Sequence, residues 1–117
     1  MERWYLATLL SLVLHQIDAA FWHEWRMFHV PGGIQGFLLF NLVAIGVLLR
    51  GYRQVVLKLP SARRYALLCG ALGVATTLIH AGFAALGRDE FNLPLSLLAL
   101  LACLLCGSAL LLRSRPR

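Results

Sequence analysis

The run of residues 93–112, LPLSLLALLACLLCGSALLL, decides the fold class of this chain. It carries no charged side chain, and its length matches the roughly 20 apolar residues that an α-helix needs to cross the hydrocarbon core of a bilayer. Residues 4–22, 34–49 and 65–86 form three further apolar runs. Because a backbone in lipid must satisfy its hydrogen bonds internally, the four runs predict an all-α protein, a bundle of four transmembrane helices.

The composition favours the same class. Hydrophobic residues make up 60% of the chain and charged residues 14%, and the mean hydropathy is +0.75, which is unusual for a soluble domain. A chain of 117 residues has no room for a soluble domain beside four spans. We therefore expect one membrane domain over residues 1–117, with the lipid bilayer as its main partner.

The basic residues are divided unequally between the two sides of the predicted bundle. Arg26 and Arg88 lie on one side, and nine basic residues lie on the other, which carries both termini and the middle loop. By the positive-inside rule, both termini are predicted to be cytoplasmic. The net charge of +6 then reflects topology and contact with anionic lipid, and no nucleic-acid partner is expected. The nine are Arg3, Arg50, Arg53, Lys58, Arg63, Arg64, Arg113, Arg115 and Arg117.

The acidic residues favour the opposite side. Apart from Glu2, they lie toward the predicted outer ends of the first and third spans or in the outer loops, at Asp18, Glu24, Asp89 and Glu90. We therefore expect any chemistry to take place near the outer face.

Two histidines, His15 and His80, lie inside apolar runs, and Asp18 shares one helix face with His15. An Asp at a helix centre costs about 2.5–3.5 kcal/mol on insertion scales, so ionisable groups in spans usually mark function. At ~1.5 Å per residue from the inner boundary, His15 lies about 18 Å and His80 about 24 Å into the membrane. The two histidines are predicted to meet in the outer half of the bundle.

The segment of residues 21–29, FWHEWRMFH, follows the first span and spaces three aromatic residues three apart. Aromatic rings settle at the headgroup level, so the segment is predicted to continue the first helix along the membrane surface. It places Glu24 above the histidines. His29 would lie ~21 Å beyond His15 on a straight helix, so it could join a site only if the chain folds back at residues 31–33.

Three interpretations of the polar site follow. The plainest is a cluster of His15, Asp18 and His80 that fixes the helix register or passes protons. An alternative is a metal-dependent protein or membrane enzyme, in which these three residues bind zinc or iron and Glu24 completes the ligand set. A further alternative is a b-type haem with His15 and His80 as axial ligands. No pattern indicates a particular reaction.

Three short boxes carry a resemblance to a known family: HQIDAA at residues 15–20, HEWR at 23–26 and PGGIQ at 31–35. Together they resemble a family of small bacterial four-helix membrane proteins of unknown function. The resemblance implies a multi-pass protein of the bacterial plasma (inner) membrane, with a shared site around His15, Asp18 and Glu24. It implies no activity. Such a small protein is also expected to act as a homo-oligomer or as an accessory subunit of a larger membrane complex.

Overall fold

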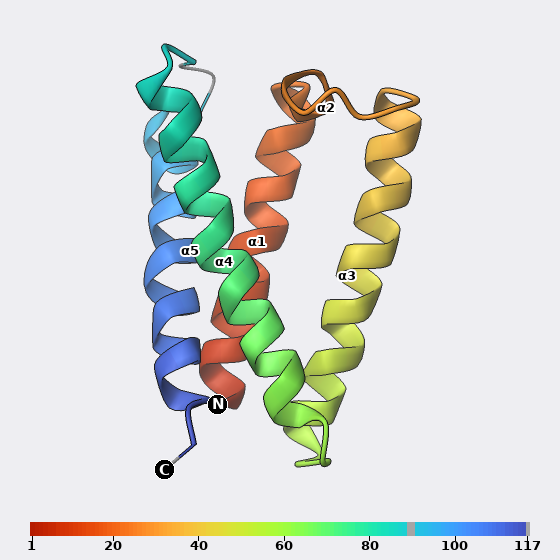
Figure 1. Cartoon of the computed structure of the whole chain (residues 1–117), viewed down its shortest axis with the longest axis vertical. Helices are drawn as coiled ribbons and strands as arrows, with labels where there is room; N and C mark the ends of the chain where they lie inside the picture. The colour runs from red at the N-terminus through yellow and green to blue at the C-terminus, as the bar shows by residue number, and fades with distance from the viewer. Residues whose placement is uncertain (89–90, 117) are drawn as a thin grey trace.

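The computed structural model describes residues 1–88 and 91–116, and in this part of the chain all regular structure is helical. Four of its helices are long and apolar enough to cross a membrane, which confirms the predicted all-α class and suggests a multi-pass membrane protein. A short fifth helix follows the first of them (Figure 1). The helices are α1 (Glu2–Phe21), α2 (Glu24–Met27), α3 (Ile34–Val56), α4 (Ala62–Ala85) and α5 (Pro94–Arg113).

The helix ends follow local chemistry more closely than hydropathy. The apolar run of the second span ends at Leu49, whereas α3 continues to Val56. Arg50 and Arg53 end the apolar run, but arginine is a good helix former and does not end the helix. α5 begins with Pro94, a position at which the missing amide hydrogen costs no helical hydrogen bond.

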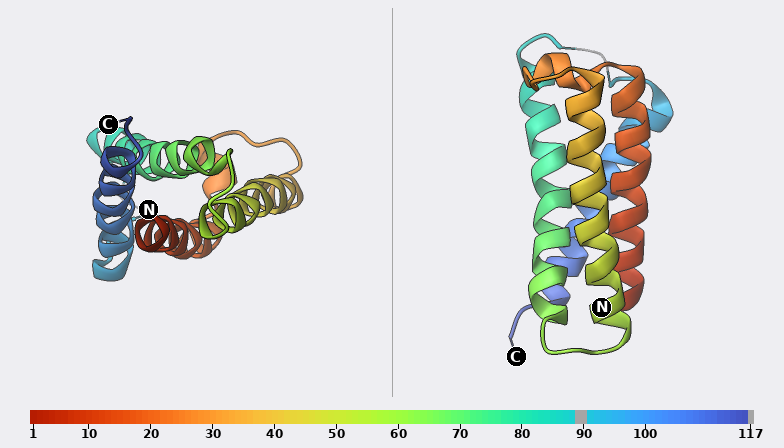
Figure 2. Two further views of the ribbon diagram at one scale, coloured as in Figure 1. Left: turned by 90° about the horizontal axis from the view of Figure 1, so that it is seen from below. Right: turned by 90° about the vertical axis from the view of Figure 1, so that its right-hand side faces the viewer.

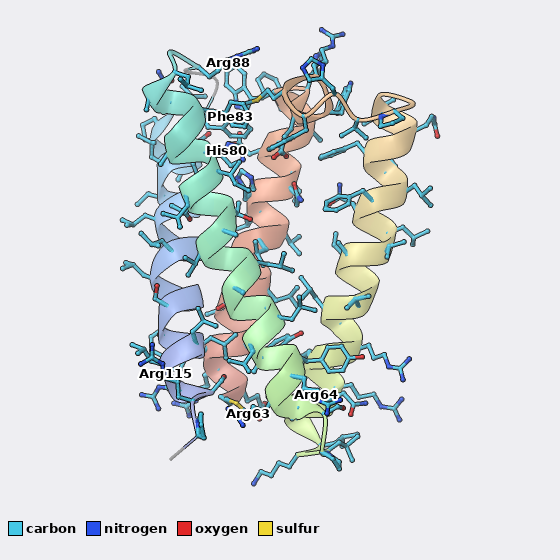
Figure 3. All side chains as sticks on the ribbon, in the orientation of Figure 1. Arg63, Arg64, His80, Phe83, Arg88 and Arg115 are labelled. Carbon is cyan, nitrogen blue, oxygen red and sulfur yellow. The ribbon has the colours of Figure 1, made fainter. Side chains whose placement is uncertain are left out.

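Both chain termini and the turn between α3 and α4 lie at one end of the bundle, here called the terminal end (Figure 1). The opposite end carries α2 and is called the α2 end. Arg63, Arg64 and Arg115 lie at the terminal end, and Arg88 lies at the α2 end (Figure 3). This division agrees with the charge pattern of the sequence. The cytoplasmic placement of the terminal end stays a prediction, and Arg117 lies outside the described residues.

Viewed along the bundle, α3 and α5 lie on opposite sides of the pair formed by α1 and α4 (Figure 2). The most extensive contacts join α4 to α5 and α1 to α5, while α3 packs less extensively on α1 and α4. Glycines allow the closest of these approaches. A Cβ atom on Gly107 would lie 2.8 Å from the carbonyl oxygen of Gly70 and 3.3 Å from the Cα atom of Gly73. Small residues permit such backbone contact between membrane helices.

A buried tyrosine joins α1 to α3 near the terminal end. The hydroxyl of Tyr5 donates a 2.6 Å hydrogen bond to the carbonyl oxygen of Leu48, and Tyr5 is fully buried. Gly51 packs directly against this hydroxyl and against the Tyr65 side chain, so a Cβ atom there would collide with both. The contact fixes α3 at this end, and α3 diverges from α4 toward the α2 end (Figure 1).

Candidate metal centre

His15 on α1 and His80 on α4 meet in the half of the bundle nearer α2. Their ring centroids lie 4.5 Å apart in an edge-to-face arrangement, and the residues are 1% and 5% exposed. His80 points from α4 toward α1 (Figure 3). The two histidines are therefore in contact, as predicted.

An interruption of the helix after α1 brings a carboxylate to the histidines. α1 ends at Phe21, and His23 adopts the left-handed conformation, with φ 55° and ψ 49°. The chain turns there and restarts as α2, whose first residue, Glu24, is 8% exposed. α1 therefore does not extend as one helix over residues 21–29, and the placement of this segment at the membrane surface stays a prediction. Its aromatic spacing suits a helix, but a single left-handed residue is enough to end one.

The Glu24 carboxylate lies against both imidazole rings. Its Oε1 atom is 3.1 Å from His80 Nε2 and 4.0 Å from His15 Nε2. One donor atom from each of the three residues lies within 4.8 Å of the others. Ligands that bind zinc at ~2.0–2.2 Å are separated by no more than about 4 Å. Small side-chain movements would therefore let all three residues bind one ion.

Several polar atoms of this cluster lack a hydrogen-bond partner among the described residues. They are Glu24 Oε2, His15 Nδ1 and His80 Nδ1. A buried carboxylate oxygen without a donor is costly, and a cation would offset that cost. The rings are oriented by packing, since the Phe91 ring centroid lies 5.3 Å from that of His15 and 4.4 Å from that of His80.

The structure does not bring Asp18 into this cluster. Asp18 Oδ1 accepts a 3.1 Å hydrogen bond from Trp22 Nε1, and the residue borders a depression between α1 and α5 together with Phe21 and Leu93. Three residues along a helix correspond to a rotation of about 300°, which turns Asp18 roughly 60° away from His15. His29 is also outside the cluster. Asp89 and Glu90, expected on the same side, lie outside the described residues.

A cavity of about 330 Å³ adjoins the cluster between α1, α3 and α4. His15, Glu24 and His80 line its α2 end, and most of its other walls are apolar. A smaller cavity of about 90 Å³ continues toward the terminal end and includes Asn41. Gln16 borders both cavities. The Gln16 Oε1 and Asn41 Oδ1 atoms are buried and have no hydrogen-bond partner among the described residues.

A comparison with known sequence families finds a match that spans residues 1–117 and therefore includes every residue of the site. The chain belongs to DUF6713, a family of unknown function. Membership agrees with the resemblance to a family without an assigned activity, and the match includes α1, α2 and α4, which supply the three donor residues. No match was found among curated proteins or among solved structures.

The geometry of this DUF6713 protein does not fit the haem alternative. Axial ligands face each other across a porphyrin ring, whereas the His15 and His80 rings touch edge to face with centroids 4.5 Å apart. Glu24 Oε1 also lies within 4.0 Å of both Nε2 atoms. The contact between the two rings leaves no space for a macrocycle between them.

Proposed function

We propose that this DUF6713 protein is a multi-pass protein of the bacterial plasma membrane that binds a divalent transition metal ion, zinc above all, through His15, Glu24 and His80. The observation that carries the proposal is the convergence of three buried donor atoms, from α1, α2 and α4, within 4.8 Å. Because these ligands come from three separate helices, the ion would also hold α2 against the bundle.

The ligand types suit zinc. Two imidazole nitrogens and one carboxylate oxygen form one of the sets that catalytic zinc sites use, with a fourth position left open. Iron(II) is the main competitor, since two histidines and one carboxylate also bind it. The open position would face the 330 Å³ cavity that the same residues line. A metal there could polarise an oxygen atom or activate a water molecule.

One observation favours a second candidate, a metal-free polar cluster. His80 Nε2 and Glu24 Oε1 are 3.1 Å apart and already form a hydrogen bond. Such a bond between α2 and α4 would fix the register of the two elements without an ion. This candidate is the structural or proton-linked cluster that the sequence suggested. It keeps His15 and His80, and Glu24 takes the place that was predicted for Asp18.

Metal content and affinity separate the two candidates. Purified protein is analysed for zinc and iron, and its zinc affinity is measured by competition with a chelating dye. We expect one zinc ion per chain, and an affinity at least about 100-fold weaker in Glu24→Gln and His80→Ala, since even second-shell changes cost 10–100-fold. Asp18→Asn and His29→Asn are the controls, because both residues lie near the cluster in sequence and outside it in space.

Either of two outcomes would contradict the proposed metal centre. A folded wild-type protein that binds no zinc or iron, or a Glu24→Gln variant with unchanged affinity, would refute the metal centre. If the metal-free wild-type protein also melts at a higher temperature than Glu24→Gln, the polar cluster is the better account. Circular dichroism and gel filtration of every variant establish that the compared proteins are folded.

A further inference from the structure

We infer that the depression between the start of α1 and the end of α5 binds the headgroup phosphate of an anionic phospholipid, and that an acyl chain of this lipid lies along the face that the two helices share. The depression has a volume of about 790 Å³ and is lined by Arg3 and Trp4 on α1 and by Arg113 on α5. It lies at the terminal end, so the inference is independent of the metal centre proposed near α2.

The charges of both arginines are available to a ligand. Arg3 and Arg113 are exposed, and among the described residues neither of them forms an ion pair. The Cζ atom of Arg113 lies over the Trp4 ring, 5.8 Å from its centroid, and this contact restrains the arginine at the edge of the depression. A guanidinium group donates paired hydrogen bonds to phosphate oxygens, so the site suits a phosphate group.

The charge balance of the depression favours a ligand with one negative charge. Glu2 also lines it, so two arginines and one glutamate give a net charge of +1. The partial charges of the helix ends oppose each other, because α1 begins and α5 ends there. Arg63, Arg64 and Arg115 lie at the same end of the bundle and add positive potential (Figure 3). Phosphatidylglycerol carries one negative charge, whereas phosphatidylcholine and phosphatidylethanolamine carry no net charge.

A second, mostly apolar depression lies farther along the same faces of α1 and α5. Leu14 and Ala102 line it. Leu14 shares a helix face with Arg3, and Ala102 shares one with Arg113, because eleven residues complete about three turns. Arg3 and Leu14 lie about 16 Å apart along the helix axis, close to the ~15 Å hydrocarbon thickness of one leaflet. A chain whose headgroup is held by the arginines would therefore reach this depression. Asp18, which also borders it, lies one turn beyond the end of such a chain.

The inference is tested by titrating the purified protein with lipids. Phosphatidylglycerol, phosphatidylethanolamine and phosphatidylcholine with identical chains are added in detergent, and bound lipid is quantified by native mass spectrometry. We expect the first phosphatidylglycerol to bind about fivefold more tightly than either other lipid, since one net charge at a membrane surface changes affinity by about that factor. Glycerophosphoglycerol, which has the headgroup without chains, should not displace the lipid at equal concentration.

Variants of single charges provide the matched comparison. Arg3→Gln and Arg113→Gln should each weaken phosphatidylglycerol binding about fivefold. Arg50→Gln is the control, because Arg50 is an exposed arginine of α3 that does not line the depression. Glu2→Gln should strengthen binding to a similar extent, because it removes the opposing charge.

A pair of tryptophan variants tests the path of the chain. Ala102→Trp fills the apolar depression and should weaken phosphatidylglycerol binding. Ala71→Trp on α4 should not, because Ala71 is exposed and borders neither depression. Circular dichroism and gel filtration establish that every variant is folded.

Several outcomes would overturn the inference. Equal binding of the three lipids, or equal affinity in Arg113→Gln and Arg50→Gln, would show only the ordinary lipid layer around the bundle. Tighter binding of phosphatidylethanolamine that Glu2→Gln abolishes would assign the site to a zwitterionic headgroup. Displacement by glycerophosphoglycerol, or unchanged binding in Ala102→Trp, would remove the chain from the site. These measurements do not involve zinc, so the metal centre stands or falls separately.

Discussion

At the scale of single residues, the conformation of His23 determines whether the candidate centre exists. A non-glycine residue at φ 55° costs roughly 1–2 kcal/mol relative to a right-handed conformation. Without this turn, α1 would continue and carry Glu24 away from His80. The unfavourable backbone angle is therefore linked directly to the contact at 3.1 Å between Glu24 Oε1 and His80 Nε2.

We predict that His23→Val weakens zinc binding about tenfold and lowers stability by about 1–2 kcal/mol, because a β-branched residue resists the left-handed conformation. His23→Gly should retain zinc affinity and melt at the same or a higher temperature. Chelator competition and thermal unfolding in detergent measure both effects. Lys58, with φ 51° at the opposite end, is the control: Lys58→Val should cost stability and leave zinc affinity unchanged.

Wild-type zinc affinity in His23→Val would contradict the role assigned to this turn.

The same position explains what the sequence could not predict about the site. His15 and His80 were found because helix rise and depth are regular. Glu24 was expected above them as a residue that could complete the ligand set, but its contact with both rings was not predicted, since no periodicity reveals a single left-handed residue. Asp18 was expected in the cluster from its spacing, but a rotation of roughly 60° and the Trp22 indole keep it out.

At the scale of helices, the crossing of α4 and α5 depends on the absence of a side chain. A Cβ atom on Gly107 would meet the Gly70 carbonyl oxygen at 2.8 Å and the Val74 amide nitrogen at 3.2 Å. These are backbone atoms, which cannot move aside as a flexible side chain can. Substitution should therefore destabilise the protein at glycines of this crossing and be tolerated at uncrowded glycines elsewhere on the same helices.

We predict that Gly107→Ala lowers the free energy of unfolding by about 1–3 kcal/mol, the usual cost of overpacking. Gly82→Ala on α4 is the matched control, because a Cβ atom there has no neighbour within 4 Å. It should be neutral or slightly stabilising, as alanine is the better helix former. Unfolding in mixed micelles measures both. Equal stability of the two variants would contradict the proposed importance of the crossing.

The sequence predicted the four long helices well because hydropathy and length are strong signals for a membrane span. The predicted helix bounds were less accurate where a helix continues beyond its apolar residues. α3 extends past Arg50 to Val56, since a helix can continue beyond the end of its apolar run. The spacing of Trp22, Trp25 and Phe28 was compatible with a helix but did not require one. Trp25 packs on Phe37 and Phe28 on Phe83, contacts that belong to the tertiary structure.

At the scale of the whole molecule, the charge asymmetry makes a topological prediction. Gln35 lies in the first turn of α3 at the α2 end, and Pro60 lies between α3 and α4 at the terminal end; both are exposed. In spheroplasts, a membrane-impermeant maleimide should label Gln35→Cys directly and Pro60→Cys only after lysis. The wild-type protein controls for Cys69, Cys103 and Cys106. Labelling of Pro60→Cys in intact spheroplasts would reverse the orientation and place the cluster in the inner half.

The contact pattern described for α5 has a consequence for biogenesis. α1 packs most extensively on α5, the last of the long helices in chain order, and α5 in turn provides the main partner of α4. During synthesis α1 and α3 enter the membrane before the helices that complete their packing. In that order of insertion, the surfaces of α1 and α3 that α4 and α5 cover in the finished bundle would first face lipid, and packing would be complete only after α5 is made.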